Sequence, residues 1–317
     1  MQRYILKRLS LAIPTILGAV TLVFFAMQLA PGDPASLFIP PDLPPADSAA
    51  LEQRINEKYG FNDPLPAQYV RYLTNLATLD LGESLRQRTL VGDDLMDRLP
   101  YTLRLGVLAL LVSAIIGIAI GVASAVFRGT WIDNILMFIA LLGVSIPSYW
   151  LAFSLILLLS IQVNWLPPSG PAEDPYSWDG VKHLIMPVTV LALGSAGALA
   201  RYTRASMLDV INRDFVRTAR AKGLRERSVL MRHAFRNALV PVVTILGLNF
   251  GFVLSGAVIV ETVFALPGIG RYLVDGVNGR DFPVVQATVL LIATGFVFGN
   301  LLTDILLAYL DPRIRFE

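Results

Sequence analysis

The sequence has 317 residues, of which 55% are hydrophobic and only 16% are charged, and its formal net charge is +2. A soluble domain carries about 25% charged residues, so this composition indicates a chain that lies mostly in a lipid bilayer. The small net charge gives no reason to expect a polyanionic partner, and the lack of cysteine excludes disulfides, thiolate metal sites and cysteine nucleophiles.

The first hydrophobic run, residues 9–30, resembles a secretory signal peptide at first sight. Its apolar part is too long and too bulky for that role, and the PGDP that follows is a poor cleavage site. We therefore expect residues 1–30 to form a cytoplasmic N-terminus and a retained first membrane helix.

Residues 31–104 are the one sizeable segment that we expect outside the membrane. The Pro-rich opening FIPPDLPPADS is typical of an irregular connector, and helices are predicted at 49–59 and 66–78. One face of the second helix would carry Tyr69, Tyr72, Leu73 and Leu76. Two interpretations stay open: a small external cap, or a cap that receives a soluble substrate carrier.

Five further hydrophobic runs follow, and about 20 apolar residues suffice to cross a bilayer as a helix. They are 105–127, 135–162, 184–200, 238–260 and 284–307. Together with the first run they predict an all-α polytopic membrane protein with six transmembrane helices and a core at 105–307. Pro147 predicts a kinked or strongly tilted third span. Small residues at Gly117, Gly121 and Ala125 predict a helix–helix contact.

The distribution of basic residues predicts the orientation of the chain. With the N-terminus inside, the inner segments 1–8, 128–134, 201–237 and 308–317 hold 16 Lys and Arg, whereas the short outer loops 163–183 and 261–283 hold 3. Positive charge is enriched in short cytoplasmic loops, so we expect six spans with both termini in the cytoplasm.

The densest basic cluster lies in the predicted cytoplasmic loop 201–237. Asp214 can act as the N-cap of a short helix, Gly223 can end that helix in a left-handed conformation, and a second helix would start near Arg225. Ala219 and Ala221 would let another backbone approach. Two plainer interpretations are the positive-inside rule and attraction to anionic lipid. The membrane tether on both sides argues against nucleic acid.

Several sequence blocks resemble one family. In chain order they are LAPGDP, DPLPAQYVRYLTNLATLDLGESL, LPYTLRLGVLALL, ARAKGL, HAFRNALVP, FALPGIGRYLVDGVNGRDFPVVQ and NLLTDILLAYLDPRIR. In this order they are similar to permeases of ABC importers, in the form found in the dipeptide, oligopeptide and nickel family. The general permease signature begins Glu-Ala-Ala, whereas this chain has Arg217-Thr218-Ala219 before Gly223. A role of that Glu in other permeases therefore does not carry over to this chain.

The resemblance implies that the loop around Gly223 is a coupling helix docked on a separate ATPase. The residues concerned are Asp214, Arg217, Ala219, Arg220, Ala221, Lys222, Gly223, Leu224, Arg225 and Glu226. It also implies a second homologous permease, two ATPase subunits, an external solute-binding protein and a bacterial or archaeal inner membrane. The chain lacks GxxxxGK[ST], so we expect no cofactor on it and ATP with Mg²⁺ on the ATPases.

The translocation pathway would be lined by modest polar groups, each of which could equally serve helix packing. The candidates are Gln28, Ser145, Ser148, Tyr149, Ser195, Asn249, Ser255, Thr288 and Asn300. Dipeptides or short oligopeptides are the expected cargo, with nickel chelates, glutathione or another small solute as alternatives. We expect no metal site from the chain's own ligands.

Two other classes of protein remain to be weighed. An intramembrane enzyme would need partners for Ser195 in LGSAG, but His183 and His233 fall near opposite membrane faces in this topology. A self-contained channel or secondary carrier would be favoured by inverted repeats or buried charges, and neither is evident.

Overall fold

The computed structural model describes the backbone of residues 2–29, 44–60, 62–251 and 257–310. Their side chains are described except at 2–9, 58–59, 240, 248–251, 304 and 306–310. Every regular element in these ranges is helical, and the one β-type contact there is an isolated bridge between Glu83 and Leu90. The all-α prediction is therefore confirmed.

Four helices are each long and apolar enough to cross a membrane. They are α1 (Gln2–Leu29), α4 (Val91–Val126), α7 (Trp178–Ile211) and α14 (Phe282–Leu310). Two bent helix pairs raise the number of candidate spans to six, in agreement with the sequence. The fourth predicted run was short, but α7 has 34 residues because its helix continues well beyond the apolar part, past Arg201 and Arg204.

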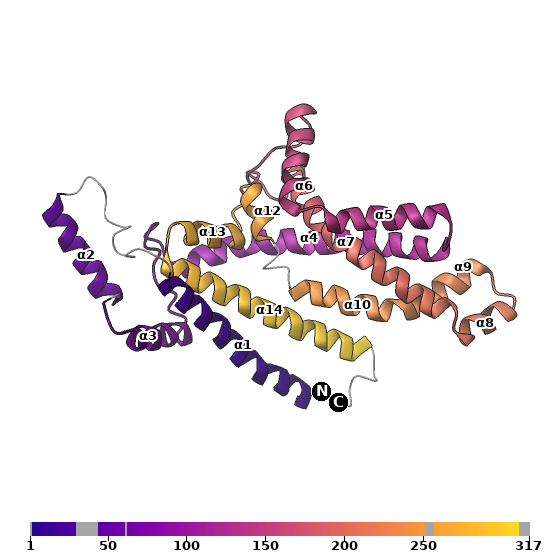
Figure 1. The fold of residues 1–317 in the computed structure, drawn as a ribbon, viewed down its shortest axis with the longest axis horizontal. Coiled ribbons are helices and arrows are strands. Elements are labelled where there is room, and N and C mark those ends of the chain that lie inside the picture. The colour runs from indigo at the N-terminus through magenta and orange to yellow at the C-terminus, as the bar shows by residue number, and fades with distance from the viewer. Residues whose placement is uncertain (1, 30–43, 61, 252–256, 311–317) are drawn as a thin grey trace.

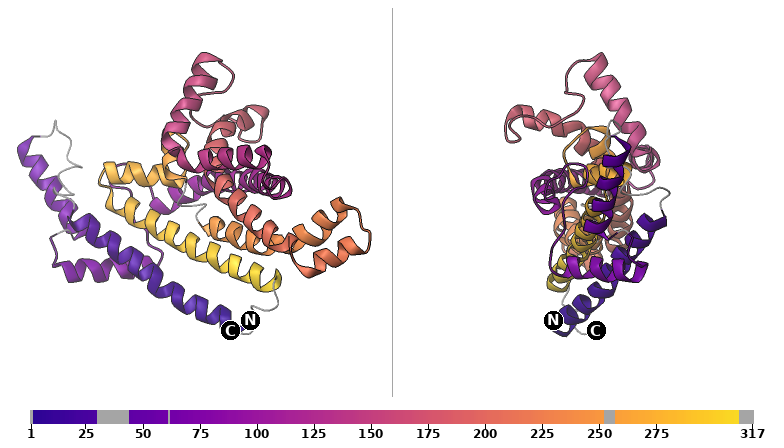
Figure 2. Two further views of the ribbon diagram at one scale, coloured as in Figure 1. Left: turned by 45° about the vertical axis from the view of Figure 1, so that its right-hand side comes forward. Right: turned by 90° about the vertical axis from the view of Figure 1, so that its left-hand side faces the viewer.

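The third predicted span is broken at Pro147. Helix α5 (Trp131–Ser145) meets α6 (Ser148–Leu155) at an angle of 99°, and a π-helical turn η2 (Ile156–Gln162) continues α6. Pro147 lacks an N–H group and forces the preceding Ile146 into an extended conformation, with ψ 123°. Figures 1 and 2 show α6 standing away from the long helices. The predicted bend is confirmed, and it is much sharper than a kink within one continuous helix.

The fifth predicted span begins with α9 (Glu226–Ser228) and a second π-helical turn, η3 (Val229–Phe235), and continues as α10 (Arg236–Gly251). The span bends by 46° between Glu226–Leu239 and Pro241–Gly247, at the proline inside α10. Two short helices, α12 (Val258–Val263) and α13 (Ile269–Asn278), then lead to α14. Neither π-helical turn was predicted from the sequence.

Glycines on α4 allow the backbones of α4 and α7 to approach closely. A Cβ atom on Gly117 would lie 2.8 Å from the carbonyl oxygen of Ala196, and one on Gly121 would lie 2.5 Å from Cβ of Thr203. Side chains larger than hydrogen would force these backbones apart. The predicted contact of the small residues is thus confirmed, and it forms within the chain.

The segment between α1 and α4, predicted to lie outside, carries α2 (Pro45–Tyr59) and α3 (Leu65–Ala77), close to the two predicted helices. The predicted face of α3 packs on α1 and α14: the ring of Tyr72 stacks on that of Phe24 at 5.6 Å, and the hydroxyl groups of Tyr69 and Thr21 lie 2.6 Å apart. Helix α3 is therefore fixed to the membrane helices. Figure 1 places α2 and α3 at the end of the molecule opposite to α9.

Candidate functional site

The basic loop forms one end of the molecule. Helix α7 runs without interruption to Ile211, a short turn follows, and α8 (Asp214–Ala221) then leads through Gly223 to α9 (Figures 1 and 2). Because α7 and α10 both continue into the loop, a displacement of α8 would act directly on two long helices.

The start of α8 differs from the prediction by one residue. Arg213, with extended backbone angles of φ −72° and ψ 151°, holds the N-cap position, and no side chain caps the helix there. Asp214 instead opens the first turn, because α7 already ends at Ile211 and leaves only two residues for the turn. Its carboxylate is fully exposed and lies 3.8 Å from Nη1 of Arg217. An acidic side chain at this position still interacts favourably with the positive end of the helix dipole.

One face of α8 is buried inside the protein. Val216 and Ala219 pack in a cluster with Ala125 of α4, Met207 of α7 and Val229 of η3. The expectation that Ala219 offers a small surface to another protein is therefore wrong, because Ala219 lies one turn from Val216 on the inward face and is 5% exposed. Ala221 is exposed, as expected. Burial of this face holds α8 rigidly against α4, α7 and η3.

The turn after α8 has two local supports. Gly223 has φ +74°, as predicted, and its N–H group donates to the carbonyl oxygen of Arg220 at 2.9 Å. The guanidinium of Arg220 also donates to the carboxylate of Glu226, with Nη2 to Oε1 at 2.8 Å and Nε to Oε2 at 3.2 Å. Arg220 and Glu226 thus close the loop on itself. The sequence placed Arg220 in the basic cluster but did not indicate its partner Glu226.

The outward side of the loop combines charge with two large apolar side chains. Phe215 is 45% exposed and Leu224 is 42% exposed, beside the exposed Lys222 and Arg225. Sequence reasoning missed Phe215. The signal was present, because Val216 and Ala219 occupy one helical face and Phe215 must then point elsewhere. An exposed aromatic side chain in a rigid setting is typical of a protein–protein contact.

A buried ion pair joins α5 to α7, close to the C-terminal end of α7, where the chain leads into α8. Asp133, 3% exposed, accepts from Nε and Nη2 of Arg204, from the hydroxyl of Ser124 and from the backbone N–H of Gly129. Sequence reasoning missed it, because Asp133 was counted only as part of an inner loop. A single carboxylate at the edge of a long apolar run was the available signal.

The predicted pathway residues fall at several places. Ser145, Ser148 and Tyr149 flank the break at Pro147. Gln28 lies near the C-terminal end of α1, where its amide donates to Gln68 at 2.7 Å. Ser195 and Asn300 are half-buried on α7 and α14. Thr288 is buried and donates to the carbonyl oxygen of Val284 in its own helix. The side chain of Asn249 and the whole of Ser255 lie outside the described residues.

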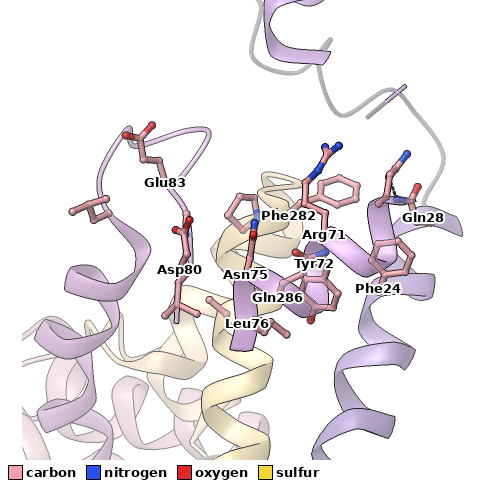
Figure 3. Close-up of a pocket in the computed structure, with 16 residues that line it drawn as sticks. Phe24, Gln28, Arg71, Tyr72, Asn75, Leu76, Asp80, Glu83, Phe282 and Gln286 are labelled. Carbon is pink, nitrogen blue, oxygen red and sulfur yellow. Dashed lines mark hydrogen bonds between the residues drawn. The ribbon is translucent and has the colours of Figure 1, made fainter. Parts of the chain in front are cut away.

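A cavity of about 410 Å³ opens at the end of the molecule that carries α2 and α3, between α3, α1, α14 and the segment before α4 (Figure 3). Polar and aromatic side chains both line it. Gln28 is the one predicted pathway residue among its lining residues.

Comparison with known proteins gives a consistent result. The profile of the family described as "Binding-protein-dependent transport system inner membrane component" matches residues 117–316, and the N-terminal profile of the same kind of component matches residues 1–106. The glutathione transport system permease protein GsiC of Pectobacterium atrosepticum is 43% identical over 317 residues, and the oligopeptide transport system permease protein AppB of Bacillus subtilis is 41% identical over 320 residues. Both alignments cover 100% of each chain.

A solved structure, described as the crystal structure of an amino acid ABC transporter with histidines, shares the fold. It superposes with a TM-score of 0.52 and 18% sequence identity, covering 76% of this chain and 98% of that chain.

Proposed function

This chain belongs to the family of inner membrane components of binding-protein-dependent transport systems, and we propose that it forms half of the translocation pathway of an ATP-driven importer for short peptides. It is a multi-pass membrane protein and a transport component. The observation that carries the proposal is the loop around α8, whose inward face is locked into the helical core and whose outward face presents Phe215, Leu224 and basic side chains.

Short peptides are the cargo that the relatives support best. One relative is named as an oligopeptide permease, and another is named for glutathione, which is itself a tripeptide. Dipeptides and oligopeptides are therefore our first choice, and glutathione is the alternative with a named relative. Nickel chelates remain the third choice.

The loop around Gly223 would be cytoplasmic and would bind a separate ATPase. The ten proposed coupling residues divide into two kinds. Four of them build the loop: Ala219, Arg220, Gly223 and Glu226. The other six present its surface together with Phe215: Asp214, Arg217, Ala221, Lys222, Leu224 and Arg225. ATP and Mg²⁺ would be held by the ATPase subunits. Closure of the ATPases would displace α8, and α7 and α10 would carry that displacement into the membrane.

The complete transporter would contain this chain, a second permease, two ATPase subunits and an external solute-binding protein. Basic residues on α8 would also lie close to anionic lipid headgroups. Both chain termini would be on the cytoplasmic side, the side predicted by the excess of Lys and Arg.

The proposal is tested by purifying the tagged chain from its native membrane in a mild detergent and identifying the proteins that accompany it by mass spectrometry. A second permease and an ATPase should be recovered with the wild type. The ATPase should be lost when residues 214–227 are replaced by a Gly/Ser linker. Replacement of the outer residues 167–173 by the same linker is the control and should retain it.

Recovery of the chain alone, able to conduct solute without ATP, would overturn the proposal. The cargo is tested separately in proteoliposomes that contain the complex and its solute-binding protein. Stimulation of ATP hydrolysis by dipeptides, but not by glutathione or by sugars, is the expected result.

A further inference from the structure

The cavity at the outer end is lined by acidic, basic, amide and aromatic side chains, a combination that suits a small zwitterion. Helix α3 supplies Arg71, Tyr72 and Asn75, helix α14 supplies Phe282 and Gln286, and the segment before α4 supplies Asp80 and Glu83. Figure 3 shows Arg71 and Glu83 towards the opening and Tyr72 deeper, between α14 and α1. The volume of about 410 Å³ lies in the range of small-molecule sites.

Two carboxamide groups line the cavity from different helices. The side-chain amides of Asn75 on α3 and Gln286 on α14 make no hydrogen bond to the described residues. A carboxamide both donates and accepts, as does a peptide group, so each can pair with the backbone of an extended peptide. These two amides are therefore available to a ligand without breaking an existing bond.

The charged groups are placed for the two ends of such a ligand. Asp80 and Glu83 lie on one wall, and both are exposed. A free α-amino group is largely protonated near neutral pH and would be attracted to these carboxylates. Arg71 stands on the α3 wall and is paired with Asp63.

The deep part of the cavity is aromatic. The rings of Phe24 and Tyr72 stack there, and Tyr72 is 7% exposed with a buried hydroxyl that has no hydrogen-bond partner among the described residues. An apolar ligand side chain could cover the rings of Phe24 and Phe282.

We propose that this cavity is an outer-face acceptor site for a short peptide, with Asp80 and Glu83 binding its ammonium group and Asn75 and Gln286 binding its peptide group. The inference rests on the proposed peptide cargo and adds a site on this subunit. The peptide would occupy it after release from the solute-binding protein and before it enters the membrane.

The test uses the complete membrane complex in nanodiscs of phosphatidylglycerol, without the solute-binding protein, so that no zwitterionic lipid competes. Binding of a radiolabelled dipeptide is measured by scintillation proximity. The double variant Asp80→Asn/Glu83→Gln should weaken binding at least tenfold. An N-acetylated dipeptide should bind weakly and equally to wild type and variant.

The matched control is Asp93→Asn/Asp97→Asn, which removes two exposed carboxylates of α4 that do not line the cavity. It should leave binding unchanged. Asn75→Leu should weaken the free and the acetylated dipeptide alike, since it removes a partner of the peptide group.

Equal binding by wild type and Asp80→Asn/Glu83→Gln would overturn the site. The site would also be overturned if the wild-type complex bound no dipeptide while its uptake of peptide, with the solute-binding protein present, was normal. In that case the proposed function would still stand. Lower uptake by the double variant with unchanged dipeptide binding would assign the carboxylates to the solute-binding protein instead and would also overturn the site. Loss of peptide uptake by the wild-type complex would reject the proposed function itself.

Discussion

Asp133 and Arg204, 71 residues apart in the sequence, form a two-point ion pair in which Nε–Oδ1 and Nη2–Oδ2 are both 2.8 Å. The pair joins the first turn of α5 to the part of α7 that leads into the loop, and Ser124 adds α4 to the same cluster. Three helices are thereby fixed to one another close to the proposed ATPase contact. If α8 is displaced by the ATPase as proposed, these contacts would carry the displacement to α4 and α5 as well as to α7.

Asp133→Ala should destabilise the protein strongly. The change leaves the guanidinium of Arg204 partly buried without its carboxylate, which costs about 3 kcal/mol in comparable buried pairs. The expected result is a clear drop in the Tm of the protein in detergent. Size-exclusion chromatography with fluorescence detection, after heating to a series of temperatures, measures this Tm. Asp209→Ala is the control, because its pair with Arg213 is fully on the surface and should leave Tm unchanged. Equal Tm values for the two variants would remove the structural role of the buried pair.

Gly223→Pro should uncouple ATP hydrolysis from transport while the chain stays inserted. Proline requires φ near −65°, whereas Gly223 has φ +74°, and proline would also remove the N–H group that bonds to Arg220. Gly170→Pro is matched, since Gly170 has φ +85° and donates to Phe264, but it lies in a predicted outer loop. Transport per ATP hydrolysed, measured in proteoliposomes, should fall for the first variant only. Normal coupling in Gly223→Pro would refute the assignment of the loop.

Phe215→Ala should weaken binding of the ATPase by about thirtyfold, because loss of a central aromatic contact typically costs about 2 kcal/mol or more. Affinity is measured by biolayer interferometry with the permease in nanodiscs. Phe127→Ala is the control: Phe127 is also 45% exposed, but it ends α4 and does not belong to the loop. A similar loss in both variants would indicate a general surface effect and count against Phe215 as an anchor.

Glu261 should make the free energy of unfolding fall as the pH rises. Its buried carboxylate accepts from Thr102 at 2.6 Å and from the N–H groups of Gly270 and Arg271 at the start of α13. Burial raises the pKa of Glu261 in spite of these bonds. The folded state therefore holds the proton more tightly than the unfolded chain does, so the contribution to stability is complete below the unfolded pKa and is lost as the pH rises through the folded pKa.

We accordingly expect the Tm of the wild type to fall relative to that of Glu261→Gln as the pH is raised from about 4 to about 7. Differential scanning fluorimetry in detergent measures both proteins across this range. A Tm difference that does not change with pH would contradict the raised pKa.

The parts of the structure that follow from local chemistry were predicted from the sequence. Hydrophobic runs located the spans, Pro147 located the break, and Gly223 located the left-handed turn. The prediction that Tyr69 and Tyr72 share one face of α3 is also confirmed, since the two residues lie one helical turn apart.

The remainder depends on contacts between distant segments. Ala219 is buried only because Met207 and Val229 lie against it, and the partner of Asp133 is far along the chain. The 99° angle at Pro147 is likewise set by packing, since proline dictates a bend but not its size. No local pattern contains this information.

The close seam between α4 and α7 also restricts where cargo can pass. At Gly117 and Gly121 there is no room even for a methyl group between the two helices, so a solute cannot permeate through that seam. The subunit behaves there as a solid wall. In the proposed transporter, a peptide would pass along another surface of this subunit, and the proposed second permease would enclose its route through the bilayer.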